Sequence, residues 1–161
     1  MDAIQLLESQ HREVEDLFVD IEGSNDNEEK MELFEELADK LAVHAAIEEH
    51  HFYPAVKDRR TKDILLESLE EHLAVKRILA DLMDSSPEEE NFDAQIKVLK
   101  ETVAHHVEEE EDELFPKVRK LFNKEELEAM GQEMSAEQAE LEDKGAPRRA
   151  IPSQTEHAAS I

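Results

Sequence analysis

Apolar residues recur every three or four positions along most of the chain, which places them on one face of an α-helix. Five such stretches follow one another, separated by short polar segments or by proline. After residue 144 the pattern stops and Pro, Arg and Ser become frequent, so we expect a flexible tail over 145–161. The pattern predicts helices over about residues 2–22, 28–57, 61–83, 87–121 and 124–143.

The segments between these stretches carry helix start and stop signals. A Gly-Ser-Asn-Asp-Asn run at 23–27 separates the first helix from the second. A Ser-Ser-Pro sequence at 85–87 predicts the start of the fourth helix, with a break near Asn91 as an alternative. The Asn-Lys-Glu-Glu sequence at 123–126 resembles a capping box, and Pro54 is expected to kink or end the second helix.

Four long helices joined by short connections are typical of an antiparallel bundle. A chain of 161 residues is long enough for one compact domain, and its three glycines leave little material for the turns of a many-stranded sheet. The sequence therefore predicts an all-α fold. We expect an up-down-up-down four-helix bundle over 1–122, an accessory C-terminal helix packed on it over 123–144, and the tail over 145–161.

One histidine interrupts the apolar face of each of the four long helices: His11, His44, His72 and His106. A single histidine in such a position is usually an ordinary core residue. Four of them, one per helix, would be costly to bury together unless something compensates them. A bound metal ion does so.

Two carboxylates strengthen this interpretation. Glu48 lies four residues after His44, and Glu110 lies four residues after His106, so each pair occupies one side of its helix about one turn apart. The two segments also share the longer pattern H-x-x-x-E-E-x-x-Φ-Φ-P, in which Φ is apolar or aromatic. Bundle cores are where sites for two metal ions are built from such residues.

The helical period distinguishes these candidates from the polar residues next to them, because it shows which side chains share the apolar face. His51 returns to the face of His44, and Glu48 with His51 forms an E-x-x-H motif; we favour a supporting or helix-end role over a ligand role for His51. Residues off the apolar faces are expected to meet solvent or to support the ligands from behind, namely Glu49, His105, Glu109 and Glu111.

The order H, HxxxE, H, HxxxE over about residues 1–120 resembles the HHE cation-binding domains of the hemerythrin family. The resemblance implies an antiparallel four-helix bundle holding two iron ions that two carboxylates and an oxygen bridge. It implies that Glu48 and Glu110 are the bridges and that the four histidines complete the metal-ligand set: His11, His44, Glu48, His72, His106 and Glu110.

The chain departs from the oxygen-carrying members of the family at two points. Lys76 stands where they have a second histidine, and the last helix has HxxxE in place of HxxxxD. The pattern is similar to a bacterial subgroup with an added C-terminal helix, which implies peroxide disproportionation or binding of O2 or NO. We expect Lys76 to extend outward, with a role in proton movement as the alternative. Tyr53, the only tyrosine, is either a group at the open metal positions or an aromatic residue that closes the bundle end.

Imidazole and carboxylate ligands suit iron, manganese or zinc, and iron is favoured by the resemblance over the other two. Six protein ligands and one bridging oxygen leave about two of the roughly twelve positions of two octahedral ions free. We therefore expect a small-molecule partner, namely O2, hydrogen peroxide or NO. Catalase-like turnover is the favoured activity, and sensing, carrying or iron binding without turnover is the alternative.

The charge of the chain narrows its partners further. There are 43 acidic and 18 basic residues, a formal net charge of −25, which repels nucleic acids and anionic membranes. The absence of cysteine excludes disulfides and thiolate metal sites. No apolar run approaches the ~20 residues of a membrane span. We expect a cytoplasmic protein, monomeric or homodimeric, without nucleic-acid or membrane partners.

Overall fold

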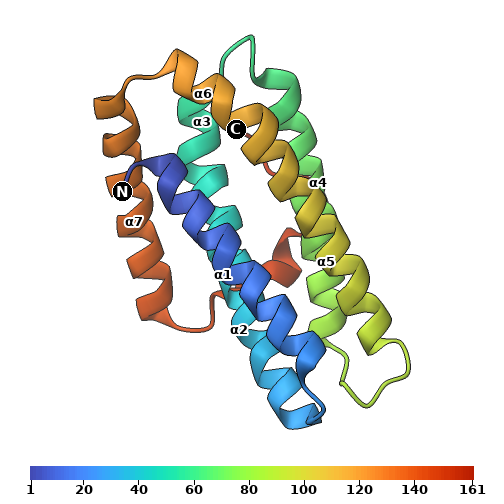
Figure 1. Cartoon of the computed structure of the whole chain (residues 1–161). Coiled ribbons are helices and arrows are strands. Elements are labelled where there is room, and N and C mark those ends of the chain that lie inside the picture. The colour runs from blue at the N-terminus through green and yellow to red at the C-terminus, as the bar shows by residue number, and fades with distance from the viewer.

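The computed structural model describes residues 1–161 and consists of helices joined by turns and loops (Figure 1). Two π-helical turns, η1 (Glu48–Phe52) and η2 (Glu110–Leu114), and a 3-10 helix, η3 (Pro147–Gln154), accompany the α-helices. The α-helices are α1 (Ala3–Gly23), α2 (Asn27–Ile47), α3 (Tyr53–Val56), α4 (Lys62–Met83), α5 (Phe92–Glu109), α6 (Phe115–Leu121) and α7 (Lys124–Lys144).

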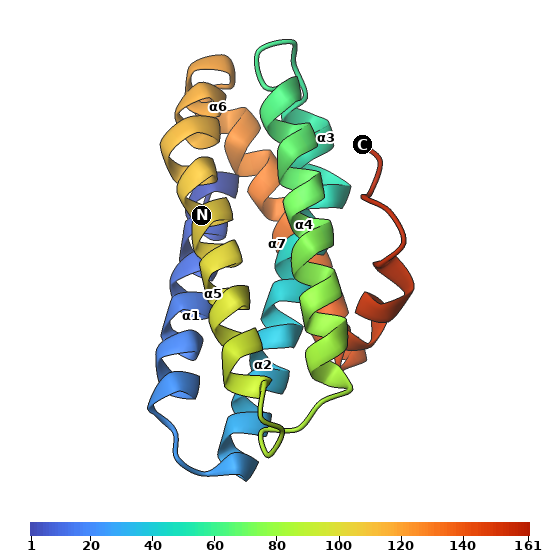
Figure 2. The ribbon, with the colours of Figure 1, turned by 90° about the vertical axis from the view of Figure 1, so that its right-hand side faces the viewer.

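Four rods form the predicted bundle, and their directions alternate up and down (Figure 2). The rods are α1, α2 with η1 and α3, α4, and α5 with η2 and α6. Their apolar faces form two separate clusters, one around Phe52 and Leu114 and one around Phe34 and Phe92. The inward-facing histidines and glutamates form a polar layer between these clusters. The all-α bundle fold is thus confirmed. None of the helices combines the length and apolar character needed to cross a membrane.

The fourth rod does not start at Pro87, and the structure agrees with the alternative, a break near Asn91. Residues 85–91 form turns, and α5 begins at Phe92 rather than at Pro87. The Ser86 carbonyl accepts only a single turn-type bond from the Glu89 amide, at 2.9 Å, so Ser86 and Pro87 begin one turn that does not continue. Phe92 is fully buried, which fixes the first turn of α5 against the core. The capping box at Asn123 and Glu126 is confirmed, with both bonds at 2.9 Å.

Each HxxxE segment passes into a π-helical turn, and a local widening replaces the kink or end predicted at Pro54. The amide of Tyr53 bonds to the carbonyl of Glu48, and that of Phe115 bonds to the carbonyl of Glu110, five residues back in each case. A proline follows each turn, and its ring cannot fit against the carbonyl of a regular α-helix. One extra residue per turn gives the ring room, so both rods continue past their prolines.

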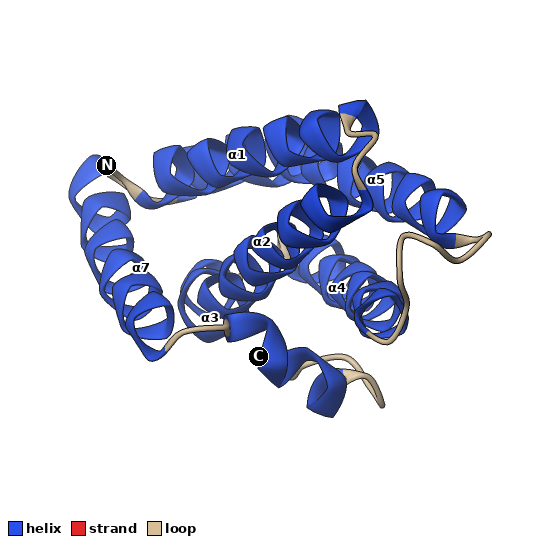
Figure 3. Ribbon diagram, turned by 90° about the horizontal axis from the view of Figure 1, so that it is seen from below, coloured by secondary structure: helices blue, strands red, loops and turns tan.

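The C-terminal third lies on the outside of the bundle. Helix α7 packs against α1 and α2, as the view from below shows (Figure 3). The chain then reverses at Gly145 and Ala146, which have positive φ angles of 77° and 47°, and η3 packs against α2 and α4. Residues 147–154, expected within a flexible tail, therefore form an ordered turn on the bundle. The division into bundle, accessory helix and tail stays a prediction.

Candidate metal centre

Six buried side chains from four rods meet in the polar layer of the bundle. None of them is more than 6 % exposed, and Glu48 and Glu110 are fully buried. They are the six residues that the sequence indicated: His11, His44, Glu48, His72, His106 and Glu110. The structure thus brings all of them together, one or two from each rod.

Two carboxylate oxygens lie at the middle of this group. Oε1 of Glu48 is 3.0 Å from Nε2 of His44 and 3.2 Å from Nε2 of His72. Oε1 of Glu110 is 3.1 Å from Nε2 of His11 and 3.3 Å from Nε2 of His106. Each carboxylate therefore contacts one imidazole of its own rod and one imidazole of another rod. Ligand atoms of His44, Glu48, His106 and Glu110 all lie within 4.8 Å of one another.

The outer nitrogen of every imidazole is held by an acceptor on the preceding rod. Nδ1 of His44 contacts Oε1 of Gln10 at 2.6 Å, and Nδ1 of His72 contacts Oε2 of Glu49 at 2.7 Å. An amide or carboxylate oxygen only accepts, so Nδ1 carries a proton and Nε2 is the nitrogen that can present a lone pair inward to a cation. Each rod thus fixes the tautomer of the next.

The other two imidazoles complete this ring. Nδ1 of His106 contacts Oε1 of Glu71 at 3.0 Å, and Nδ1 of His11 contacts Oε2 of Glu111 at 2.6 Å. Each of the four rods therefore provides an acceptor for the histidine of the rod that follows it in the chain. The acceptor on the last rod, Glu111, binds the histidine of the first rod. The inner surface consequently presents lone pairs from nitrogen and carboxylate oxygen, which is the arrangement that a cation requires.

Tyr53 and Lys76 lie at the edge of this group. The Tyr53 hydroxyl donates to Oε2 of Glu110 at 2.7 Å and lies 3.2 Å from Nε2 of His72. The expectation that Lys76 extends outward is wrong. Its side chain is buried, and Nζ donates to both oxygens of Glu49 at 2.9 and 3.0 Å. The carboxylate that holds His72 explains this, because it offers the ammonium group an ion pair inside the bundle.

Without metal, protons take the place of cations in this layer. Burial lowers the pKa of His44, but Glu48 and Glu110 outweigh it and raise that pKa to about 9. Burial and Glu110 raise the pKa of Glu48, whereas His44 and His106 lower it, with a net result of about 2. Burial, followed by the nearby carboxylates, raises the pKa of Tyr53 well above its usual value. Tyr53 therefore stays a neutral hydrogen-bond donor.

Three buried polar atoms indicate whether these residues fit a metal ion, because a metal ion could bind atoms that make no hydrogen bond. Nε2 of His44 and both carboxylate oxygens of Glu48 are buried and make no hydrogen bond of normal geometry, although Nε2 lies 3.0 Å from one of these oxygens. Buried polar atoms that make no hydrogen bond cost roughly 1–3 kcal/mol each. Ligands bonded at about 2.1 Å to one octahedral ion lie about 3 Å apart, close to the separations around the two carboxylates. The residues fit a metal site of nitrogen and oxygen donors.

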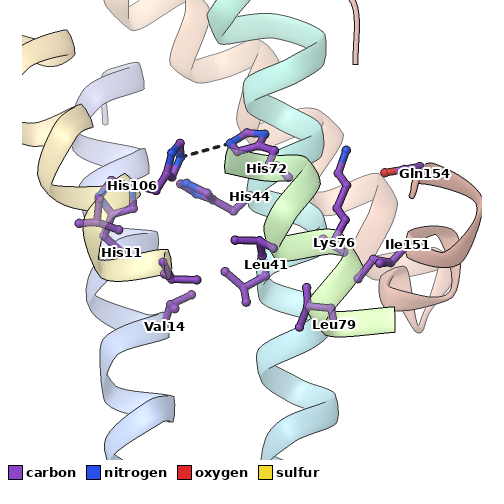
Figure 4. A pocket seen from close by; sticks show the side chains of 15 residues that line it. His11, Val14, Leu41, His44, His72, Lys76, Leu79, His106, Ile151 and Gln154 are labelled. Atoms are coloured by element: carbon purple, nitrogen blue, oxygen red, sulfur yellow. Dashed lines mark hydrogen bonds between the residues drawn. The ribbon is translucent and has the colours of Figure 1, made fainter. Parts of the chain in front are cut away.

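A cavity of about 40 Å³ adjoins the imidazoles. One water molecule needs ~10–15 Å³, so the space suits a few waters or one small molecule. Figure 4 shows His44, His72 and His106 pointing toward one another, with Ile151 and Gln154 beyond Lys76. Most of the remaining lining is apolar: Val14, Leu41, Val75, Leu79, Val103 and Val107.

Other candidates lie outside the cluster. Nε2 of His51 pairs with Glu137 of α7 at 2.9 Å, so this side chain faces α7 from within η1. The side chain of His105 is 61 % exposed. The sequence did not single out Gln10 and Glu71 as partners of the histidines. For Glu49 and Glu111 it left two roles open, solvent exposure or support of the ligands. Each of these four is the neighbour in sequence of an inward residue, about 100° round the helix, and so points toward an adjacent rod.

The family model for the hemerythrin HHE cation-binding domain matches residues 2–118. The chain belongs to this family. A crystal structure of a hemerythrin HHE cation-binding domain-containing protein from Mycobacterium kansasii superposes with a TM-score of 0.78 at 25% identity. The match covers 93% of this chain and 99% of that one. The HHE domain here thus shares its bundle, and a buried His and Glu cluster compatible with metal binding lies in its core.

A protein named DNA nickase from Nostoc sp. is 28% identical to this HHE domain over 142 residues. The match covers 88% of this chain and 40% of that protein, so the chain spans less than half the length of this relative.

Proposed function

We propose that His11, His44, Glu48, His72, His106 and Glu110 hold two iron ions at which a small oxidant or gas reacts. The ring of acceptors carries this proposal, because it turns four Nε2 lone pairs toward two carboxylates with no intervening donor except the Tyr53 hydroxyl. Glu48 and Glu110 would bridge the ions, because each reaches the imidazoles of two rods.

The favoured activity is the disproportionation of hydrogen peroxide, in which two peroxide molecules give one O2 and two waters. Iron supplies the exchange of two electrons between its ferrous and ferric states. The protein supplies the surroundings: Tyr53 keeps a proton at Oε2 of Glu110, and the buried pair of Lys76 and Glu49 fixes His72. The apolar walls of the cavity limit water and favour a small uncharged ligand.

The cavity also supports the second candidate, binding of O2 or NO without turnover. Its volume and apolar lining suit a diatomic gas as well as peroxide. Manganese and zinc use the same ligand types and are less favoured. DNA cleavage is not favoured for this chain, because its formal charge of −25 opposes contact with DNA phosphates.

Metal analysis with an absorption spectrum tests the ligand set. The variant His106→Ala is expected to lose most of the iron and its absorption bands. The adjacent exposed residue gives a matched control, and His105→Ala is expected to retain both. Equal iron content in the two variants would remove His106 from the site.

Oxygen evolution from peroxide separates the two candidate activities. The iron-loaded wild type is expected to release O2, and His106→Ala is not. A wild type that binds NO or O2 with a spectral change, yet evolves no oxygen, supports the carrier or sensor instead.

A further inference from the structure

The gap between α2 and α4 is filled by the segment that follows α7. These two rods touch each other far less than α1 touches α2, and η3 packs against both. In Figure 2 the segment runs along the outside of α4 toward the C-terminus. This side of the bundle is therefore closed by residues 147–156, which we call the strap.

Two arginines fasten the strap to both rods. Nη1 and the backbone amide of Arg148 donate to the carboxylate of Asp39 at 3.0–3.2 Å, and Nη2 donates to Glu35 at 2.9 Å. Both acceptors belong to α2. Arg77 of α4 donates to the carbonyls of Thr155 and Glu156 at 2.9 and 3.0 Å. The strap thus has one polar attachment on each rod.

Ile151 lies between these attachments and forms the outer wall of the cavity. It is only 2 % exposed and belongs to the apolar cluster around Phe34 and Phe92. Every other residue that lines the cavity belongs to α1, α2, α4 or α5, except Gln154, which is also in η3. In Figure 4 the two strap side chains lie opposite the imidazoles. Moving η3 away would open the cavity directly to solvent.

We propose that the strap controls access to the centre and that Ile151 sets the size limit. A path walled by Ile151, Leu79 and Leu41 admits small uncharged molecules and rejects bulky ones. It also rejects anions, because the ammonium group of Lys76 in the same lining is already paired with Glu49 and the rest of this wall is apolar. The access route rests on this geometry alone. Assigning O2, NO or peroxide as the molecule that uses it rests on the proposed function.

Tyrosine fluorescence can measure this access without any enzymatic activity. Tyr53 is the only tyrosine and the chain has no tryptophan, so the emission comes from the centre alone. The ring is fully buried and does not line the cavity itself, but it stacks at a centroid distance of 5.4 Å on His72, which does. The full-length protein is freed of iron and supplied with Zn²⁺, which is redox-inert. Quenching is then compared for O2, acrylamide and iodide.

The wild type is expected to be quenched by O2 and hardly by acrylamide or iodide. Arg148→Gln releases the attachment on α2 and is expected to raise the acrylamide quenching constant about tenfold, the effect of losing a charged hydrogen bond. Ile151→Ala widens the wall without loss of a hydrogen bond and is expected to raise the same constant. Ser153 lies in the same turn and is exposed, so Ser153→Ala is the matched control. No change in the acrylamide quenching constant is expected for it.

If both variants are folded by circular dichroism and their acrylamide quenching constants equal that of the wild type, the strap is not the access route. Acrylamide quenching of the wild type as efficient as that by O2 would also overturn the proposal. Metal analysis of the iron-containing preparations judges the proposed function separately, since a protein that binds no iron still gives a valid quenching result.

Discussion

At the scale of single residues, the centre is built from pairs of neighbours in sequence that serve different purposes. Of each pair, one side chain points into the bundle and the other points sideways to the adjacent rod, as with Glu48 and Glu49. The inward members could be predicted, because they continue the apolar period. The sideways members could not be assigned with certainty, since glutamate is common on exposed helix faces and only the packing of rods reveals its partner.

The pair of Lys76 and Glu49 gives a prediction at this scale. Lys76→Met leaves the Glu49 carboxylate buried without its ammonium partner, and breaking a buried pair in this way costs roughly 3 kcal/mol. The double variant Lys76→Met, Glu49→Gln keeps an acceptor for His72 without the charge, and should recover part of the loss. Urea unfolding of the full-length protein measures both values.

Lys40 provides the comparison, because it pairs with Glu13 at 2.6 Å on a partly exposed surface. Lys40→Met is expected to cost less than about 1 kcal/mol. If Lys76→Met costs no more than this, the buried pair contributes nothing beyond a surface contact.

At the scale of helices, the periodicity predicted the rods and their order but not every end. The sequence at 85–87 contains a good start signal, yet α5 begins at Phe92 because burial of that ring decides the first turn. The sequence did not predict the π-helical turns either. A proline indicates that a helix must change, but whether it ends, kinks or widens depends on the packing around it.

The docking of α7 also depends on a feature that the sequence alone does not interpret. A Cβ atom at Gly131 would lie 2.6 Å from the carbonyl oxygen of Met1 and 2.9 Å from the amide nitrogen of Ala3. These are backbone atoms that cannot turn aside. Helix α7 also supports the centre, since Gln138 accepts a hydrogen bond from Gln10, which in turn holds His44.

Gly131→Ala should therefore loosen α7. We expect a loss of roughly 2–3 kcal/mol, or about 4–10 °C in the melting temperature, from the overlap. Gly23→Ala is the matched control, because a Cβ atom there meets nothing within 4 Å. It is expected to be neutral or to stabilise by up to about 1 kcal/mol. Equal melting temperatures for the two variants would show that α7 is not seated against the N-terminus.

At the scale of the whole molecule, the polar layer divides the core into two apolar clusters, and its stability depends on what neutralises it. The family and the bundle follow from the order of the motifs, which the sequence displays in full. The identity of the neutralising species does not follow from it, because protons and metal ions satisfy the same side chains. Stability as a function of pH distinguishes them.

In the metal-free protein, the pKa of His44 is raised from 6.5 to about 9, so its contribution is fully present below pH 6.5 and is lost as pH rises through 9. That contribution is on the order of 3 kcal/mol. The pKa of Glu48 is lowered to about 2, so its contribution is lost only as pH falls from 4.5 toward 2. The melting temperature of metal-free protein should therefore fall between pH 6.5 and 9.

Bound metal removes this dependence, because a coordinated imidazole carries no proton on Nε2 to lose. The metal-loaded protein is therefore expected to keep its melting temperature over the same interval, and the gap between the two forms should widen steadily with pH. His44→Gln cannot be protonated at this position, so its metal-free form should show a shallower decline than metal-free wild type. A metal-free wild type whose melting temperature stays level from pH 6.5 to 9 would contradict the view that protons stand in for the metal, because the charge of the two central carboxylates would then need no cation at all.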